Sequence, residues 1–183
     1  MNMLTTRPSK RDKVGFLNRD LMYDLLEGDV PVGSLVYMPR TLSATIAIGD
    51  QKYSVARVSD RPDERLYQAL IRIMTGSEKP PVNPWALKDE AGRTLALAEE
   101  VKRGFAVSRA DESFSFRKGT RPYHLYRDGH DRPLGSVGQA TFFTRTLHMD
   151  LPAEFDPAFQ VFLLTLLLSL TMKQLDSSSS YSA

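Results

Sequence analysis

The stretch that decides the fold is DPAFQVFLLTLLLSLTMK, residues 156–173. Asp156 is a suitable N-cap residue, and Pro157 suits the first helical position, where its missing N–H does no harm. No charged residue follows until Lys173, and the few polar residues do not share one stripe at about 3.6 residues per turn. The pattern therefore predicts a helix over residues 157–173 that is apolar nearly all round and must be surrounded by protein or by lipid.

The length of this run favours protein as its surroundings. The uncharged segment spans about 15 residues, or about 22 Å of helix, whereas the hydrocarbon core of a bilayer is about 30 Å thick. A short apolar helix of this kind is more often buried in a protein core than inserted in a membrane. The alternative is a C-terminal membrane anchor, in which Lys173 would extend to the lipid surface.

The whole chain has the size and composition of one globular domain. It has 183 residues, of which 42% are hydrophobic and 25% charged, and its net charge is +2. So small a net charge gives little reason to expect nucleic-acid binding. The absence of cysteine excludes disulfides, thiol catalysis and thiolate metal sites. The N-terminal residues lack the apolar core of a signal peptide, which favours a cytoplasmic protein, free or peripheral to a membrane.

Both ends of the chain are polar. Residues 1–12 are basic and rich in turn-forming residues, which predicts a flexible arm able to contact phosphates or anionic lipid. Residues 176–183 are rich in serine, which predicts a flexible tail. The sequence thus predicts a single folded domain over residues 13–175.

Short apolar stretches separated by turn residues fill most of this domain. Turn signals recur about every ten residues, a rhythm typical of antiparallel strands in a barrel or a sandwich. The predicted strands lie within residues 14–17, 21–26, 32–37, 41–48, 53–58, 85–88, 93–98, 105–108, 113–117, 123–127, 134–138 and 140–144.

One segment interrupts the strand pattern. Residues 62–75 carry acidic residues near their start and apolar residues at helical spacing, and prolines follow Gly76. This pattern predicts an amphipathic helix on the outside of the sheet or across one end of a barrel.

A strand–turn–strand unit recurs along the chain. Residues 23–35 and 123–137 share the order Tyr-x-Leu, a turn, and Gly-Ser, and residues 85–95 form a degenerate third copy. Repetition of such a hairpin suits a closed antiparallel barrel, because one hairpin alone cannot bury its apolar face. A two-layer sandwich is the alternative.

This order of short strands followed by an apolar C-terminal helix resembles the tubby-like superfamily. That group includes the tubby C-terminal domain, the phospholipid scramblases and the plant LURP-one-related proteins. The resemblance covers residues 14–172 and rests on the repeated hairpins and on Leu151-Pro152 and Asp156-Pro157 before the helix. It implies a mainly β fold in which an antiparallel barrel of about 10 to 12 strands encloses the C-terminal helix. The acidic calcium-binding and cysteine-rich segments of the scramblases have no counterpart here.

Signatures of catalysis are lacking in the sequence. There is no nucleophile elbow, P-loop or dinucleotide-binding glycine motif. His124, His130 and His148 do not have metal-ligand spacing, and a zinc site would need them to converge with a carboxylate such as Asp128 or Asp150. We therefore expect no catalytic residue, no metal and no cofactor.

Basic residues near predicted turns give the better functional hypothesis. If the barrel brings them to one rim, they can bind phosphate groups. The tubby domain binds phosphoinositide headgroups, so the resemblance implies the same ligand class. The structural alternative is that these residues are dispersed and keep the strand edges unpaired. The candidate residues are Lys102, Arg103, Arg117, Lys118, Arg121 and Arg127.

Two functions of different classes follow. The first is a non-enzymatic binding or adaptor module that docks on anionic lipid headgroups, or on a partner protein, through a basic rim. The second is a ligand-binding or enzymatic protein that uses a cleft between the barrel and the outer helix, which would require polar groups converging in an apolar pocket. We favour the first. The sequence leaves the oligomeric state open.

Overall fold

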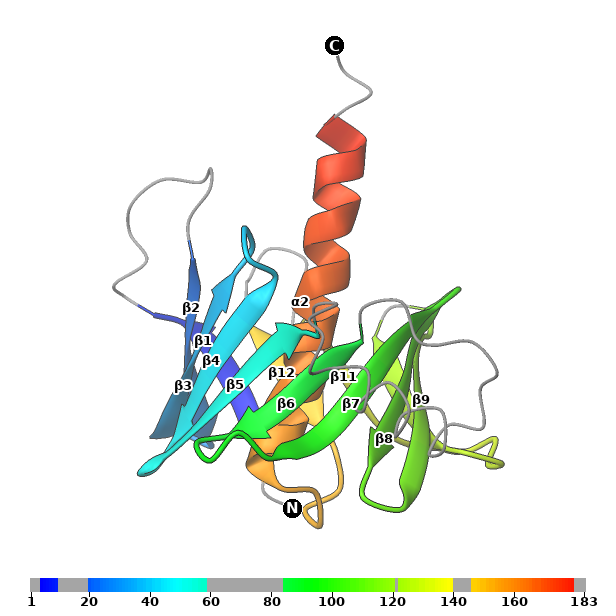
Figure 1. Ribbon diagram of the computed structural model, residues 1–183, viewed down its shortest axis with the longest axis horizontal. Coiled ribbons are helices and arrows are strands. Elements are labelled where there is room, and N and C mark those ends of the chain that lie inside the picture. The colour runs from blue at the N-terminus through cyan, green and yellow to red at the C-terminus, as the bar shows by residue number, and fades with distance from the viewer. Residues whose placement is uncertain (1–3, 10–19, 59–83, 121, 140–145, 180–183) are drawn as a thin grey trace.

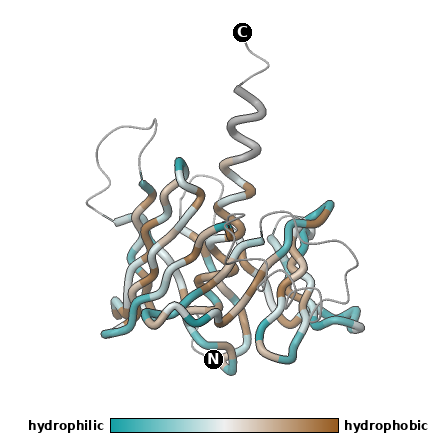
Figure 2. The backbone as a smooth tube through the Cα atoms, in the orientation of Figure 1, coloured by the Kyte–Doolittle hydropathy of each residue, from teal (hydrophilic) through white to brown (hydrophobic). Residues whose placement is uncertain are grey.

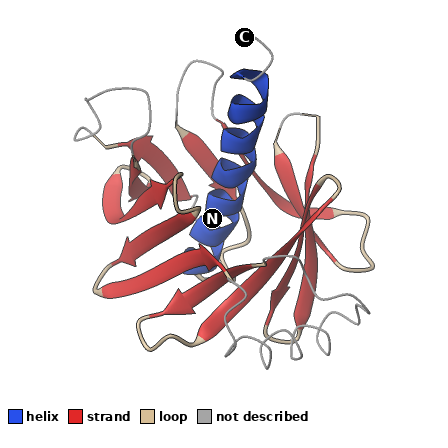
Figure 3. Cartoon of the chain, turned by 45° about the horizontal axis from the view of Figure 1, so that its top comes forward, coloured by secondary structure: helices blue, strands red, loops and turns tan. Residues whose placement is uncertain are grey.

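The protein is an antiparallel β-barrel with a helix through its centre, as Figure 1 and Figure 3 show. The computed structural model describes residues 4–9, 20–58, 84–120, 122–139 and 146–179. Within these residues, twelve strands form one closed sheet and one helix fills it. The elements are β1 (Leu4–Pro8), β2 (Leu21–Glu27), β3 (Val30–Met38), β4 (Ser43–Ile48), β5 (Gln51–Arg57), β6 (Trp85–Asp89), β7 (Thr94–Val101), β8 (Gly104–Arg109), β9 (Glu112–Lys118), β10 (Tyr123–Arg127), β11 (Pro133–Gln139), β12 (Leu147–Asp150) and α2 (Pro157–Ser179).

Strands β2 to β12 follow one another around the barrel in chain order, and β1 closes the ring. Leu4 of β1 lies opposite Met149 of β12 on one side and opposite Glu27 of β2 on the other. The prediction of a flexible arm over residues 1–12 is therefore wrong for residues 4–8. Their polar sequence reflects strand alternation, because Leu4 and Thr6 are buried while Arg7 is exposed.

Helix α2 lies on the barrel axis and is buried through most of its length. Leu163, Leu164 and Leu166 are completely buried, which confirms the predicted central helix. Its polar side chains are tolerated because they bond to backbone carbonyls, with Thr165 Oγ1 donating to Val161 O (2.9 Å) and Ser169 Oγ to Leu166 O (2.7 Å). The predicted N-cap is also confirmed, since the Ala158 N–H donates to Asp156 Oδ1 at 2.7 Å.

The helix is longer than the sequence predicts. It continues to Ser179, and its last turns project beyond the barrel (Figure 1), so the predicted flexible tail is wrong for residues 176–179. Within the described residues, no helix has both the length and the apolar character needed to cross a bilayer. The predicted outer helix over residues 62–75 lies outside the described residues.

The predicted hairpin repeat is confirmed by matching β-bulges. The register shifts after Leu25 in the β2–β3 pair, after Leu87 in β6–β7 and after Leu125 in β10–β11. The three bulged hairpins thus recur every four strands around the ring. A bulge increases local twist and bends the strand, which helps the sheet to close.

The repeat also supplies equivalent core residues. The three leucines at the bulges are buried in the core cluster that includes α2, and so is an aromatic residue two positions earlier in each hairpin. These residues are Leu25, Leu87 and Leu125, and Tyr23, Trp85 and Tyr123. Figure 2 shows hydrophilic residues gathered at the tips of the hairpins. Many of the hydrophilic residues therefore lie at the two ends of the barrel.

Candidate functional site

The two ends of the barrel differ in charge. In an antiparallel ring, alternate connections lie at opposite ends. Among the described residues, the connections at the end where α2 begins carry eight acidic and two basic residues, whereas those at the other end carry three basic residues and one acidic residue. The first set is Asp29, Asp50, Glu90, Asp111, Asp128, Asp131, Glu154 and Asp156 with Arg93 and Arg132, and the second is Arg40, Lys102 and Arg103 with Asp20.

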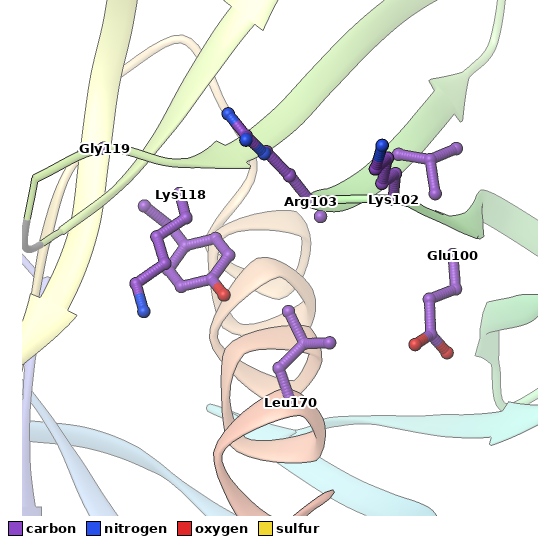
Figure 4. A pocket seen from close by; sticks show the side chains of 9 residues that line it. Glu100, Lys102, Arg103, Lys118, Gly119 and Leu170 are labelled. Carbon is purple, nitrogen blue, oxygen red and sulfur yellow. The ribbon is translucent and has the colours of Figure 1, made fainter. Parts of the chain in front are cut away.

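A pocket of about 380 Å³ opens at the basic end, beside the point where α2 leaves the barrel. We call it the mouth pocket, and Figure 4 shows its lining. The turn between β7 and β8 forms one side, the end of β9 forms another, and Leu170 of α2 lies between them. Its lining residues are Glu100, Val101, Lys102, Arg103, Gly104, Lys118, Gly119, Tyr123 and Leu170.

Backbone contacts hold the two cationic walls of the mouth pocket together. The Lys118 N–H donates a hydrogen bond to the Arg103 carbonyl oxygen at 3.2 Å. In the connection between β9 and β10, the Gly119 N–H donates a hydrogen bond to the Pro122 carbonyl oxygen at 2.9 Å. Gly104 is required here because a Cβ on it would lie 2.0 Å from the Phe116 carbonyl oxygen. The relative position of Arg103 and Lys118 is thus fixed by the sheet, which pre-organises the pocket.

The cations of the mouth pocket are available to a ligand. In the described part of the chain, Lys102, Arg103 and Lys118 form no ion pair, and all three are exposed. Glu100 lines the same pocket and pairs with Arg57 at 3.2 Å. Arg57 itself lies over the Trp85 ring, 5.4 Å from the centroid, and is not part of the lining. The lining is therefore net cationic and suits an anion.

Tyr123 forms the polar inner wall of the mouth pocket. It lies opposite Lys118 in the β9–β10 pair, and its side chain is buried. Burial raises the pKa of the Tyr123 hydroxyl above its usual value of 10.0, so the group stays protonated at neutral pH. A protonated phenol can donate a hydrogen bond to a bound oxyanion.

The structure brings three of the candidate residues together and separates the others. Lys102, Arg103 and Lys118 line the mouth pocket. Arg117 directly precedes Lys118 in β9, so its side chain faces outward, where it stacks on Tyr126 with the guanidinium carbon 4.1 Å from the ring centroid. Arg127 lies at the opposite end of β10 and pairs with Glu112 at 2.7 Å. Arg121 lies outside the described residues.

The sequence contains signals that would have refined this set. Phe114, Phe116 and Lys118 alternate along β9, so the period of two places Lys118 on the barrel-facing side and Arg117 on the outer side. Alternation of turns likewise places Arg127 at the end opposite Lys102. The contributions of Tyr123 and Leu170 depend on the path of α2 and have no local signal.

Two other kinds of site were considered from the sequence, a zinc site and a cleft beside an outer helix. His124 lies on β10, His130 in the following turn and His148 on β12, and no three acidic or histidine side chains in the described ranges could hold a metal ion together. The cleft proposed between the barrel and an outer helix involves residues outside those ranges.

The residues that line the mouth pocket have the chemistry to hold an anion. Its polar groups are hydrogen-bond donors with positive charge, joined by a phenol, one carboxylate and an apolar floor. Such donors suit phosphate oxygens, and the leucine suits an adjoining apolar group. Comparison of the chain with protein-family models, with curated proteins and with solved structures gives no match.

Proposed function

We propose that this protein is a non-enzymatic docking module of the tubby-like kind, whose mouth pocket binds anionic phospholipid headgroups at a membrane surface. The observation that carries the proposal is the convergence of Lys102, Arg103 and Lys118, none of them in an ion pair within the described residues, at one pocket. Three cations within one site supply both attraction and hydrogen bonds to phosphate.

The charge difference between the two ends supports a fixed orientation on the membrane. An anionic bilayer attracts the end with Lys102 and Arg103 and repels the end that carries Asp111 and Asp128. Val101, which is 46% exposed, adjoins Lys102 at the tip of the β7–β8 hairpin. An apolar residue beside two cations at a hairpin tip suits the interface between headgroups and acyl chains.

Sedimentation with vesicles tests this proposal. The wild-type protein should sediment with phosphatidylcholine vesicles that contain phosphatidylglycerol and stay in solution with phosphatidylcholine alone. The triple variant Lys102→Gln/Arg103→Gln/Lys118→Gln should lose this binding. The matched control Lys52→Gln/Arg93→Gln/Arg132→Gln removes the same charge from the acidic end and should keep it.

Three results would refute the proposal. The first is an equal loss of binding in the two triple variants. The second is wild-type binding to phosphatidylcholine vesicles that equals its binding to vesicles with phosphatidylglycerol. The third is no wild-type binding to either kind of vesicle. In the last case a partner protein becomes the alternative occupant of the basic end. Circular dichroism and thermal unfolding of each variant check that the substitutions have left the barrel folded.

A further inference from the structure

The mouth pocket contains charges of both signs. Glu100 and Lys118 lie on opposite sides of the pocket, with Leu170 between them (Figure 4). Lys102 and Arg103, in the turn that follows β7, complete the cationic part of the lining. A ligand that is anionic throughout would bring like charge towards Glu100, whereas a ligand with a separate positive group would match both signs of charge.

Glu100 is held in this position by the barrel wall. It follows Ala96 and Ala98 at alternate positions of β7, which are buried against the core, so its side chain lies on the inner side of the strand. Arg57 of β5 forms an ion pair with the Glu100 carboxylate at 3.2 Å, and strand β6 lies between the two strands that carry them. A carboxylate can accept about four hydrogen bonds, so pairing with Arg57 is compatible with a second cationic partner.

We propose that Glu100 makes the mouth pocket selective for an anionic headgroup that also carries an ammonium group, namely the headgroup of phosphatidylserine. The inference rests on the proposed function. The phosphate and the carboxylate of that headgroup would bind Lys118, Arg103 and Lys102, and its ammonium group would bind Glu100.

The chemistry of other headgroups explains the choice. Phosphatidylglycerol has the same net charge as phosphatidylserine but no ammonium group, so it offers no positive group to Glu100. Phosphatidylethanolamine has the ammonium group but lacks the second anion, so it meets fewer of the three cations. The serine headgroup alone among these matches both signs of charge in the pocket.

Paired vesicles separate this selectivity from general attraction to negative charge. Phosphatidylserine and phosphatidylglycerol are mixed with phosphatidylcholine at the same mole fraction, so the two surfaces have equal charge. Because ion pairs in partly exposed sites are weak, we expect the wild-type protein to bind the serine vesicles about three- to fivefold more tightly. Glu100→Gln should bind the two vesicles equally and should bind the glycerol vesicles at least as well as the wild-type protein does.

Glu99→Gln is the matched control. Glu99 adjoins Glu100 in sequence and carries the same charge, but it lines a depression on the outer wall with Ala106 and Ser115 and does not line the mouth pocket. This variant should keep the preference for phosphatidylserine. The selectivity is refuted if the wild-type protein binds both vesicles equally, or if Glu99→Gln loses the preference as Glu100→Gln does. Absence of binding to both vesicles refutes the proposed function as well.

Discussion

The Lys118 N–H donates a hydrogen bond to the carbonyl oxygen of Arg103 at 3.2 Å. This contact joins the end of β9 to the turn that precedes β8, so the backbones of two cationic residues, one in a strand and one in a turn, are held together at one pocket. The position of the cations is therefore a property of the sheet, and changes in the sheet at this point should alter binding.

Gly104→Ala tests the dependence of the mouth pocket on close strand packing. The added Cβ would lie 2.0 Å from the Phe116 carbonyl oxygen, so β8 and β9 must separate. We expect a loss of about 1–3 kcal/mol in the free energy of unfolding, measured with denaturant, and weaker vesicle binding. In Gly28→Ala the new Cβ has no neighbouring atom within 4 Å, so the only cost is the backbone strain of an alanine at φ +61°. That control should cost less, and a larger loss in the control would contradict this explanation.

Reversal of one charge distinguishes the two ends of the barrel. Lys118→Glu and Arg127→Glu change the net charge by the same amount, but Lys118 lies in the mouth pocket and Arg127 at the acidic end. We expect Lys118→Glu to lower the affinity for phosphatidylglycerol vesicles by at least tenfold and Arg127→Glu to change it by less than about threefold. Equal effects would indicate that net charge alone governs binding.

Leu166→Asp tests the position of α2. Leu166 is completely buried, so an aspartate there would be a desolvated carboxylate in an apolar core. The expected cost of several kcal/mol is comparable to the stability of a small domain, and the variant should aggregate or fail to fold. Thr171→Asp on the exposed side of the same helix should fold normally. A soluble Leu166→Asp protein with a sharp thermal transition would contradict the central-helix fold, as would cooperative unfolding of a chain that lacks residues 157–183.

Thr6→Val tests the closure of the barrel by β1. Thr6 is completely buried, and its Oγ1 accepts a hydrogen bond from the Leu147 N–H at 3.3 Å. Valine keeps the shape but leaves that buried N–H without this partner, so we expect a loss of about 1–3 kcal/mol in the free energy of unfolding. Thr5→Val, on the outer face of the same strand, should change stability by less than about 0.5 kcal/mol. Equal stabilities of the two variants would mean that β1 is not part of the closed sheet.

The central helix and most strands could be predicted because their signals are local. An apolar run without a polar face cannot form a surface helix, so a buried helix is expected. The N-cap residue Asp156 marks the start of this helix. The repeated hairpins could be recognised because each places an aromatic residue and a leucine before a turn and a glycine or alanine after it. Their equivalent bulges in the structure explain why this order recurs.

The two strands that close the barrel were missed for a physical reason. β1 and β12 are short, and their pairing joins Leu4 to Met149 across almost the whole chain. No local pattern reports such a contact, and a polar segment such as residues 4–8 resembles a flexible arm until its partners are known. Leu147–Asp150 was likewise not predicted as a strand, and the predicted strand over residues 140–144 lies outside the described residues.

Only part of the candidate site could be predicted, because residue type alone does not place a side chain in the fold. Residue type and proximity to turns identified Lys102, Arg103 and Lys118, but they do not distinguish the two ends or the two faces of the sheet. Arg117 and Arg127 satisfied the same criteria and lie elsewhere. Alternation along the strand and alternation of the turns provide this information, because the first determines the side of the strand and the second the end of the barrel.

Hydrogen exchange in the presence of vesicles tests the central claim most directly, because it reports which end of the barrel meets the membrane. On addition of phosphatidylserine-containing vesicles, we predict slower exchange of the backbone amides in residues 101–104 and 117–119, around the mouth pocket. Amides in the turns at Gly28–Asp29, Ala110–Asp111 and Asp128–Gly129 should exchange at unchanged rates. Protection confined to those acidic turns, or no protection around the mouth pocket while the protein is bound, would contradict the account.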